Sequence, residues 1–209
     1  DWNVWDRTGE LHVKVMREER ELNVMVLLDR SASMNFGEGE GNKARVALEL
    51  TALLGFSALQ NQDRFGCLSL TDGLEHVHPP LRGRAHLLQL LRHLLSDPPA
   101  ESATDLCAGL GYVQRHLRKG AILFILSDFL VSGYEDQLRK LALKHRIILL
   151  RLYHPSEQLP QGMGFLPVVD AENGTRGIRF TGMRRFWKAT AEAPNPAGLP
   201  FPAVGRHLR

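Results

Sequence analysis

Two short, continuous apolar runs constrain the fold of this chain more than any other feature of its sequence. The first is N-V-M-V-L-L at residues 23–28, and the second is A-I-L-F-I-L at residues 121–126. A strand that lacks polar alternation is usually buried on both faces, as in a parallel sheet covered by helices. Both runs therefore predict central strands of such a sheet.

Helical and strand-like segments alternate along the rest of the chain. Apolar spacing predicts helices at residues 43–60, 84–95, 105–117 and 134–144. Further strands are predicted at residues 64–71, 146–152 and, at an edge of the sheet, 165–170. This order predicts an α/β fold, with a doubly wound, mostly parallel sheet and helices on both of its faces.

Two details of these elements can also be predicted. The first helix should bury one apolar face, formed by Val46, Leu50, Leu53, Leu54 and Ala58. Asp72-Gly73 is a hairpin signal, so residues 75–78 should return as an antiparallel edge strand. Proline cannot donate to a strand ladder, and Pro79-Pro80 should therefore end that strand.

Length and composition indicate one globular domain with appendages. The chain has 209 residues, of which 44% are hydrophobic, and this is enough for one sizeable core. We expect residues 1–22 to be a leading segment packed on the domain, anchored by Trp2 and Trp5. Residues 23–185 should form the domain, and residues 186–209 a proline-rich, extended tail. Because the chain begins at Asp1 rather than Met, we expect further sequence to precede it, and a membrane anchor could lie there.

Charge and cysteine content narrow the functional classes. The formal net charge is +3, and the basic residues are scattered rather than clustered, which does not favour nucleic-acid binding. We interpret Cys67 and Cys107 as buried free thiols that suit a reducing compartment, so we expect a cytoplasmic protein. No apolar run is long enough to span a membrane, and no P-loop motif for nucleotides occurs.

Polar residues follow the buried runs where the predicted strands end. The first strand continues as D-R-S-A-S-M, and the later one ends in S-D. A third segment, S-A-T-D-L, enters a helix. The carboxyl ends of parallel strands meet at one edge of a sheet, where sites form in such folds. We therefore expect five residues to converge there: Asp29, Ser31, Ser33, Thr104 and Asp128.

These five side chains offer only oxygen ligands, which hard divalent cations such as Mg²⁺ and Mn²⁺ prefer. A shell of hydroxyls and few carboxylates leaves the ion under-neutralised, so it attracts an external carboxylate. The sequence therefore predicts a Mg²⁺ (or Mn²⁺) site that grips an Asp or Glu of a partner protein. Taken singly, each residue has a structural explanation. Ser31 and Ser33 could bond backbone amides of a turn, Thr104 could cap a helix, and Asp128 could cap the segment after its strand.

The five-residue pattern resembles the metal-ion-dependent adhesion site of von Willebrand factor A domains. In that family D-x-S-x-S follows the first strand, a Thr comes from a later loop, and an Asp comes from the end of the fourth strand. Asp29, Ser31, Ser33, Thr104 and Asp128 match these positions. The resemblance implies a metal-dependent module that binds proteins and is not an enzyme.

The chain also resembles, more closely, bacterial domain-of-unknown-function family 58, which carries a divergent A domain. This resemblance rests on D-W-N-V-W-D-R-T-G-E-L-H-V-K, E-R-E-L-N-V-M-V-L-L-D-R-S-A-S-M, D-R-F-G, L-S-D-F-L and Y-H-P-S-E-Q-L-P. It covers most of residues 1–180, and the tail after Arg185 departs from it. Family members are often encoded beside MoxR-type AAA+ ATPases, which implies an accessory role in the maturation or assembly of other proteins.

Two other functions stay open at this point. A magnesium-dependent phosphohydrolase could use Asp29, although Ser31 stands where haloacid dehalogenases carry a second Asp as general acid. A degenerate A domain could bind its partner without a metal. His76 and His78 would share one face of a strand, and without a third ligand we interpret them as surface histidines.

Overall fold

A five-stranded sheet forms the centre of the computed structural model, which describes residues 21–37, 41–96, 103–154, 157, 165–169 and 176–180. Its strands are β1 (Asn23–Asp29), β2 (Arg64–Leu70), β3 (Leu74–Leu81), β4 (Ile122–Ser127) and β5 (Arg146–Arg151). They lie in the order β3-β2-β1-β4-β5. β3 runs antiparallel to β2, and the other neighbouring pairs are parallel. The predicted mostly parallel sheet with one antiparallel edge strand is confirmed.

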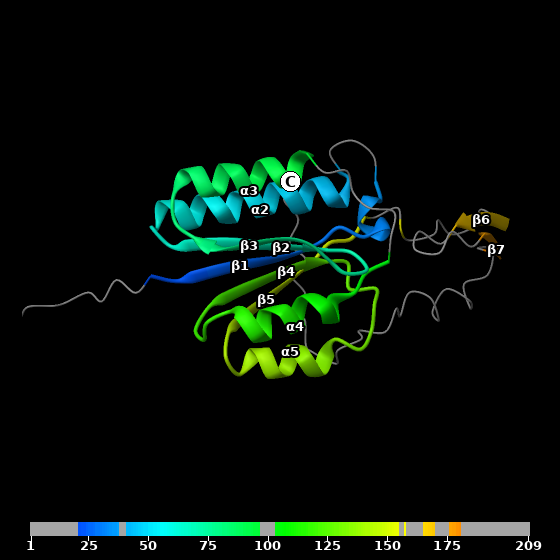
Figure 1. Ribbon diagram of the computed structural model, residues 1–209. Helices are drawn as coiled ribbons and strands as arrows, with labels where there is room; N and C mark the ends of the chain where they lie inside the picture. Colours follow the sequence, from blue (N-terminus) through cyan, green and yellow to red (C-terminus); the bar gives the residue numbers. More distant parts are fainter. Residues whose placement is uncertain are drawn as a thin grey trace, which may run out of the picture.

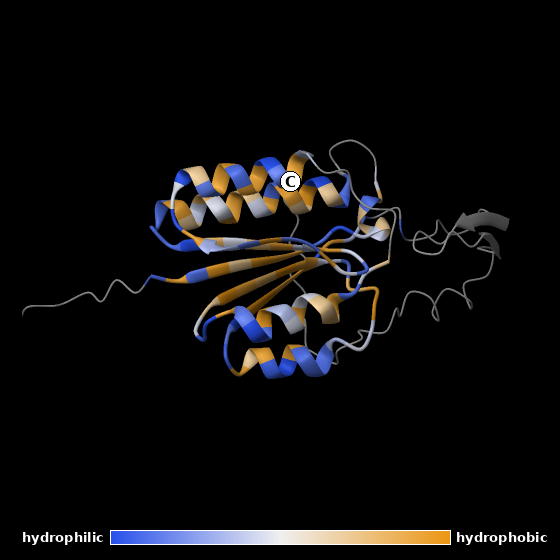
Figure 2. Ribbon diagram, viewed as in Figure 1, coloured by the Kyte–Doolittle hydropathy of each residue, from blue (hydrophilic) through white to orange (hydrophobic). Residues whose placement is uncertain are grey.

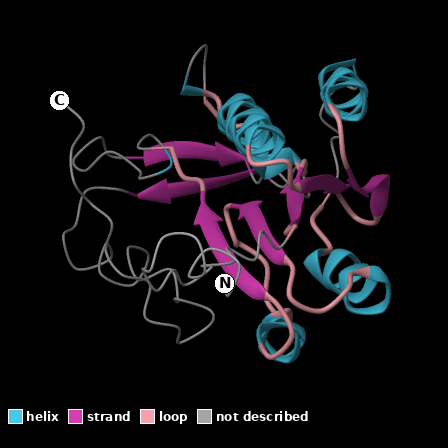
Figure 3. Ribbon diagram, turned by 90° about the vertical axis from the view of Figure 1, so that its left-hand side faces the viewer, coloured by secondary structure: helices cyan, strands magenta, loops and turns pink. Residues whose placement is uncertain are grey.

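Helices cover both faces of this sheet, as predicted. The α-helices are α2 (Lys43–Gln60), α3 (Arg84–Ser96), α4 (Leu106–His116) and α5 (Glu135–Ala142), and a short 3-10 helix, η1 (Ala32–Asn35), follows β1. α2 and α3 lie on one face, whereas α4 and α5 lie on the other (Figure 1). Figure 3 shows the same layers with the strands between them.

The hydrophobic core is divided by the sheet into two halves. Successive side chains of a strand point to opposite faces, so Met25 and Leu27 join one half with α4 and α5. Val24, Val26 and Leu28 join the other half with α2 and α3. β1 and β4, the central strands, are accordingly apolar on both faces, and Figure 2 shows them mostly in the hydrophobic colour. This explains why the sequence carries continuous apolar runs here rather than alternating ones.

The face that α2 buries differs from the predicted one. Its buried side is formed by Lys43, Ala47, Thr51, Gly55 and Ala58, whereas Leu53 is 66% exposed. A Cβ atom added at Gly55 would lie 2.5 Å from Leu87 Cδ1 of α3, so only a very small residue fits. The helix approaches its neighbours too closely for large side chains on that line. The predicted face is confirmed at Ala58 and in part at Leu50 and Leu54, which pack half-buried against the core, but it was wrong at Leu53.

The prediction that Pro79-Pro80 ends the edge strand was also wrong. β3 continues through both prolines to Leu81, which pairs with Phe65. The register shifts between Phe65 and Cys67 of β2, and such an irregularity leaves a residue outside the regular ladder. Gly66 lies opposite, and a Cβ atom there would be 2.7 Å from Pro80 N. A proline-containing edge is accommodated because β2 has a glycine at the point of closest approach.

A second, two-stranded antiparallel sheet consists of β6 (Phe165–Val169) and β7 (Arg176–Phe180). We predicted a strand at residues 165–170 on the edge of the main sheet. The strand is present, but it pairs with β7. A partner only a few residues away closes a shorter loop than the main sheet would require.

The expected leading segment and tail fall outside the described residues, apart from positions 21 and 22, and so do Trp2 and Trp5. Within the described part of the chain, no helix combines the length and apolar character that crossing a membrane requires.

Candidate functional site

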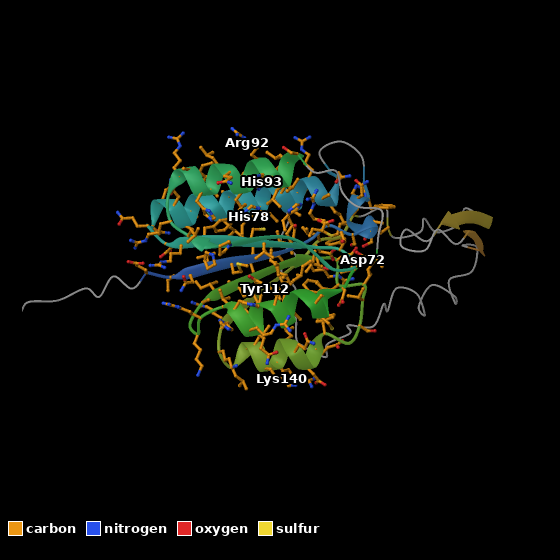
Figure 4. All side chains as sticks on the ribbon, in the orientation of Figure 1. Asp72, His78, Arg92, His93, Tyr112 and Lys140 are labelled. Carbon is orange, nitrogen blue, oxygen red and sulfur yellow. The ribbon has the colours of Figure 1, made fainter. Side chains whose placement is uncertain are left out.

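The five residues singled out by the sequence come from three segments at the carboxyl edge of the sheet. Asp29 ends β1, and Asp128 directly follows β4. Thr104 precedes α4, whose start is joined to the end of β2 because Asp105 N donates to Thr71 O at 2.6 Å. Asp72, labelled in Figure 4, marks this end of the sheet. The rule that sites form where parallel strands end therefore places these segments correctly.

Asp29 is the centre of the cluster, and only 1% of the residue is exposed. Its Oδ1 accepts hydrogen bonds from the Ser31 backbone N–H at 3.0 Å and from Thr104 Oγ1 at 3.3 Å. Its Oδ2 accepts from Ser127 Oγ at 2.6 Å. Buried carboxylates are stable only when such donors replace water. Asp29 thus ties β1, β4 and the segment before α4 together.

The two serines of D-x-S-x-S lie side by side. Ser31 Oγ and Ser33 Oγ are 3.1 Å apart, and both residues are buried. Ser31 occupies the N-cap position of η1, yet its side chain makes no capping hydrogen bond. The structural explanation that Ser31 caps the turn is therefore not supported. Asp105, rather than Thr104, caps α4, through its side chain and Ala108 N at 3.0 Å.

Asp128 is held by a buried lysine that the sequence had not singled out. Lys43 Nζ lies 2.9 Å from Asp128 Oδ2, and only 2% of the lysine side chain is exposed. The same ammonium also contacts the carboxylate of Glu157. Asp128 Oδ1 accepts from Leu130 N at 3.3 Å. The chain reverses sharply here, since Phe129 has a φ of 56°, and its N–H donates to Ser127 Oγ at 3.0 Å.

Burial and the charge of Asp128 together disfavour the ionised form of the Asp29 carboxyl. Burial raises the pKa of Asp29, and the nearby Asp128 carboxylate raises it further. The hydrogen bonds from Ser127 and Ser31 lower that pKa and oppose these effects. A bound cation would act in the same direction as the hydrogen bonds, because it stabilises the ionised carboxylates.

The donor set fits a hard divalent cation. It contains two carboxylates and three hydroxyls, and oxygen ligands of this kind suit Mg²⁺ and Mn²⁺. Among the residues that the structure describes, no three His, Cys, Asp or Glu side chains gather in a way that could hold a metal. Soft or imidazole-rich metal sites are therefore not indicated in that part of the chain. That the five residues bind a metal stays a prediction.

Sequence reasoning missed three residues of this site: Ser127, Lys43 and Glu157. Ser127 could have been found, because it is the last residue of a buried strand and directly precedes Asp128. Lys43 could also have been found, because it is the first residue of a predicted helix, where the helix dipole disfavours a positive charge. Glu157 stands in the stretch Y-H-P-S-E-Q-L-P that supports the family resemblance, but no local pattern marks it as a partner of Lys43.

The histidine pair lies away from this site. His76 and His78 are half-buried on β3 rather than exposed, so the expectation of surface histidines was wrong. The His78 ring packs against His93 of α3, with ring centroids 5.2 Å apart (Figure 4). Burial, together with the positive charges of neighbouring histidines, lowers the pKa of His78. Cys67 is buried and Cys107 half-buried, and both are free thiols.

Sequence comparison finds a family match and relatives in mycobacteria. The family described as "Protein of unknown function DUF58" matches residues 1–193. The uncharacterized protein Rv1480 of Mycobacterium tuberculosis is 30% identical over 178 residues, and so is the uncharacterized protein Mb1516 of Mycobacterium bovis. The match covers 83% of this chain and 56% of either relative. The chain thus spans just over half the length of the curated relatives it matches.

Solved structures with a similar fold are distant in sequence. An aerotolerance-related membrane protein from Bacteroides fragilis gives a TM-score of 0.53 at 14% identity, covering 77% of this chain and 82% of that one. BatB from Bacteroides thetaiotaomicron gives 0.52 at 14% identity, covering 79% and 82%. Proximal thread matrix protein 1 from the mussel byssus gives 0.50 at 17% identity, covering 62% and 37%. These likenesses show the fold, a von Willebrand factor A-like α/β domain.

Proposed function

The chain belongs to the DUF58 family, and we propose that its domain is a metal-dependent module that binds another protein. One observation carries the proposal. The buried Asp29 carboxylate accepts hydrogen bonds from Thr104 Oγ1 before α4, from Ser127 Oγ at the end of β4 and from the Ser31 backbone N–H after β1. Burial of polar groups costs free energy unless they form hydrogen bonds. Clusters of buried ionisable groups from separate segments are often functional sites.

In this proposal, Asp29, Ser31, Ser33, Thr104 and Asp128 hold Mg²⁺ or Mn²⁺ directly or through water. The bound ion attracts an Asp or Glu of a partner protein, whose carboxylate completes the coordination of the ion. The structure favours binding over phosphohydrolysis by Asp29. Ser31 stands two residues after Asp29, and its hydroxyl is engaged with Ser33. A hydroxyl of this kind is a poor general acid for protonating a leaving group.

The resemblance to family 58 supports a MoxR-type AAA+ ATPase as the partner. We propose that the protein is a cytoplasmic accessory of such an ATPase and acts in the maturation or assembly of other proteins. The proposal concerns this domain alone, because the chain spans 56% of the length of its curated mycobacterial relatives.

Calorimetric titration with Mn²⁺ and Mg²⁺ tests the metal site. We expect wild type to bind one ion and Asp29→Asn to lose at least about tenfold in affinity, because the central carboxylate becomes neutral. The matched control is Asp63→Asn, since Asp63 accepts from Leu22 N at 2.9 Å at the opposite end of the sheet. Equal affinity in wild type and Asp29→Asn would contradict the proposal. So would magnesium-dependent phosphatase turnover that Asp29→Asn abolishes.

One observation favours a second candidate, an A domain that binds partners without metal. Lys43 already supplies a positive charge at Asp128. Co-purification with a AAA+ ATPase, with and without chelator, separates the two candidates. Capture that chelator abolishes supports the metal-dependent module, whereas capture that survives chelator supports the metal-free one.

A further inference from the structure

Lys43 occupies a position that is costly for a lysine on two counts. It is the first residue of α2, where the helix dipole disfavours a positive charge. Its side chain is 2% exposed, and burial of an ammonium requires charge partners in compensation. The helix does not need it as a cap, since Asn42 accepts from Arg45 N at 3.2 Å. Lys43 is therefore held there by its tertiary contacts.

Those contacts are two carboxylates that differ in burial. Asp128 is almost fully buried inside the candidate metal site, and its Oδ2 is 2.9 Å from Lys43 Nζ. Glu157 contacts the same ammonium, and 28% of its side chain is exposed. Lys43 thus forms two ion pairs, one with a buried carboxylate of the candidate site and one with a partly exposed carboxylate.

We propose that Lys43 is a built-in competitor of the metal at Asp128, and that Glu157 sets how strongly it competes. This inference rests on the proposed metal site. A lysine paired with Asp128 holds the carboxylate that the ion needs and repels the ion directly. The ion pair with Glu157 weakens the ion pair between Lys43 and Asp128. Glu157 is in this sense a positioning residue, which acts on the metal through Lys43.

The formal charges of the cluster agree with this arrangement. Asp29, Asp128 and Glu157 contribute three negative charges and Lys43 one positive charge, which leaves a net of −2. One divalent cation balances that charge.

Mn²⁺ affinity, measured on the 209-residue chain from the electron paramagnetic resonance signal of free Mn²⁺, tests the inference. Lys43→Gln should bind Mn²⁺ about tenfold tighter or more, since Gln can still donate to Asp128 but carries no charge. Glu157→Gln should bind it several-fold more weakly. In the Lys43→Gln background, Glu157→Gln should have little further effect, because Glu157 then has no lysine to act through.

Two control variants separate this effect from a general change of charge. Arg45→Gln removes a cation two residues further along α2, where the Arg45 side chain is 53% exposed and pairs with Glu49. Its Mn²⁺ affinity should stay within about twofold of wild type. Lys43→Arg keeps the charge, and its Mn²⁺ affinity should stay near that of wild type.

If Lys43→Gln folds poorly without metal, its melting temperature should rise more on Mn²⁺ addition than that of wild type.

The outcomes distinguish this inference from the proposed function. If wild type binds Mn²⁺, Asp29→Asn does not, and Lys43→Gln binds no tighter than wild type, the competition is refuted and the metal site stands. If Glu157→Gln weakens binding equally with and without Lys43, the ion senses Glu157 directly and the positioning role is refuted. If neither wild type nor Lys43→Gln binds Mn²⁺, the proposed metal-dependent function fails as well.

Discussion

At the scale of single residues, two buried serines show how context decides what a hydroxyl contributes. Ser127 Oγ donates to Asp29 and accepts from Phe129 N, so it is satisfied in both roles. Ser69 is buried on β2, and its Oγ has no hydrogen-bond partner within the described part of the chain. The residue type is the same, but only Ser127 supports the candidate site.

Ser127→Ala should therefore destabilise the protein by about 1–3 kcal/mol at pH 7, because two buried groups lose their partner. The hydrogen bond from Ser127 lowers the pKa of Asp29, so its loss penalises the ionised form. Stability from a carboxyl whose pKa is raised by folding is present at low pH and is lost as pH rises through the folded-state pKa. The cost of Ser127→Ala should accordingly be larger at pH 7 than at pH 4.

Guanidinium unfolding of the variant at both pH values measures this cost. Ser69→Ala is the matched control, and it should be neutral or slightly stabilising because the removed hydroxyl was unpaired. Equal effects of the two substitutions would contradict the role we assign to Ser127.

At the scale of elements, the distance between α4 and the sheet is set by one glycine. A Cβ atom added at Gly109 would lie 2.6 Å from Leu70 Cδ2 and 2.8 Å from Leu27 Cδ1. Both leucines are fully buried and cannot easily move. Because Thr104 lies just before α4, the close packing of this helix also brings Thr104 within reach of Asp29.

Gly109→Ala should destabilise the fold by about 1–3 kcal/mol through overpacking, despite the better helix propensity of alanine. Gly111, two residues further along α4, provides the control. A Cβ atom there would meet nothing within 4 Å, so Gly111→Ala should stabilise by up to about 1 kcal/mol. Thermal unfolding of the two variants tests the difference, and a destabilised Gly111→Ala would show that this account of α4 is wrong.

At the scale of the whole molecule, one sheet joins two hydrophobic clusters that do not share buried residues. Leu110 of α4 belongs to the first cluster and Leu90 of α3 to the second. The strands contribute alternate side chains to each. The loss of packing on either face should therefore weaken the same sheet, and we expect the domain to unfold as one unit.

Leu90→Ala and Leu110→Ala should each cost about 2–5 kcal/mol, and both should lower a single, shared transition. Their effects should add in the double variant, because the sheet separates the two sites. Calorimetry with a comparison of calorimetric and van't Hoff enthalpies measures this. Leu143→Ala, at a position that is 88% exposed, should change little. Two resolved transitions would contradict a single cooperative unit.

The sequence by itself determined the layers, the central strands and the segments that carry the candidate site. Apolar runs and helical spacing are local patterns, and they report burial without knowledge of the neighbouring elements. The rule on strand ends then placed Asp29, Thr104 and Asp128 at one edge of the sheet. The match to residues 1–193 confirmed the resemblance to family 58. The metal, the partner and the cytoplasmic location stay predictions.

Only the tertiary structure decided which groups touch. Ser127 reaches Asp29 across 98 positions of sequence, and Lys43 reaches Asp128 across 85. The buried face of α2 and the strand through Pro79-Pro80 depended likewise on Gly55 and Gly66 at points of close approach. Hydrophobic periodicity shows that a surface is buried, but not how near its neighbour lies or which charge that neighbour carries. Those distances follow from packing the whole chain at once.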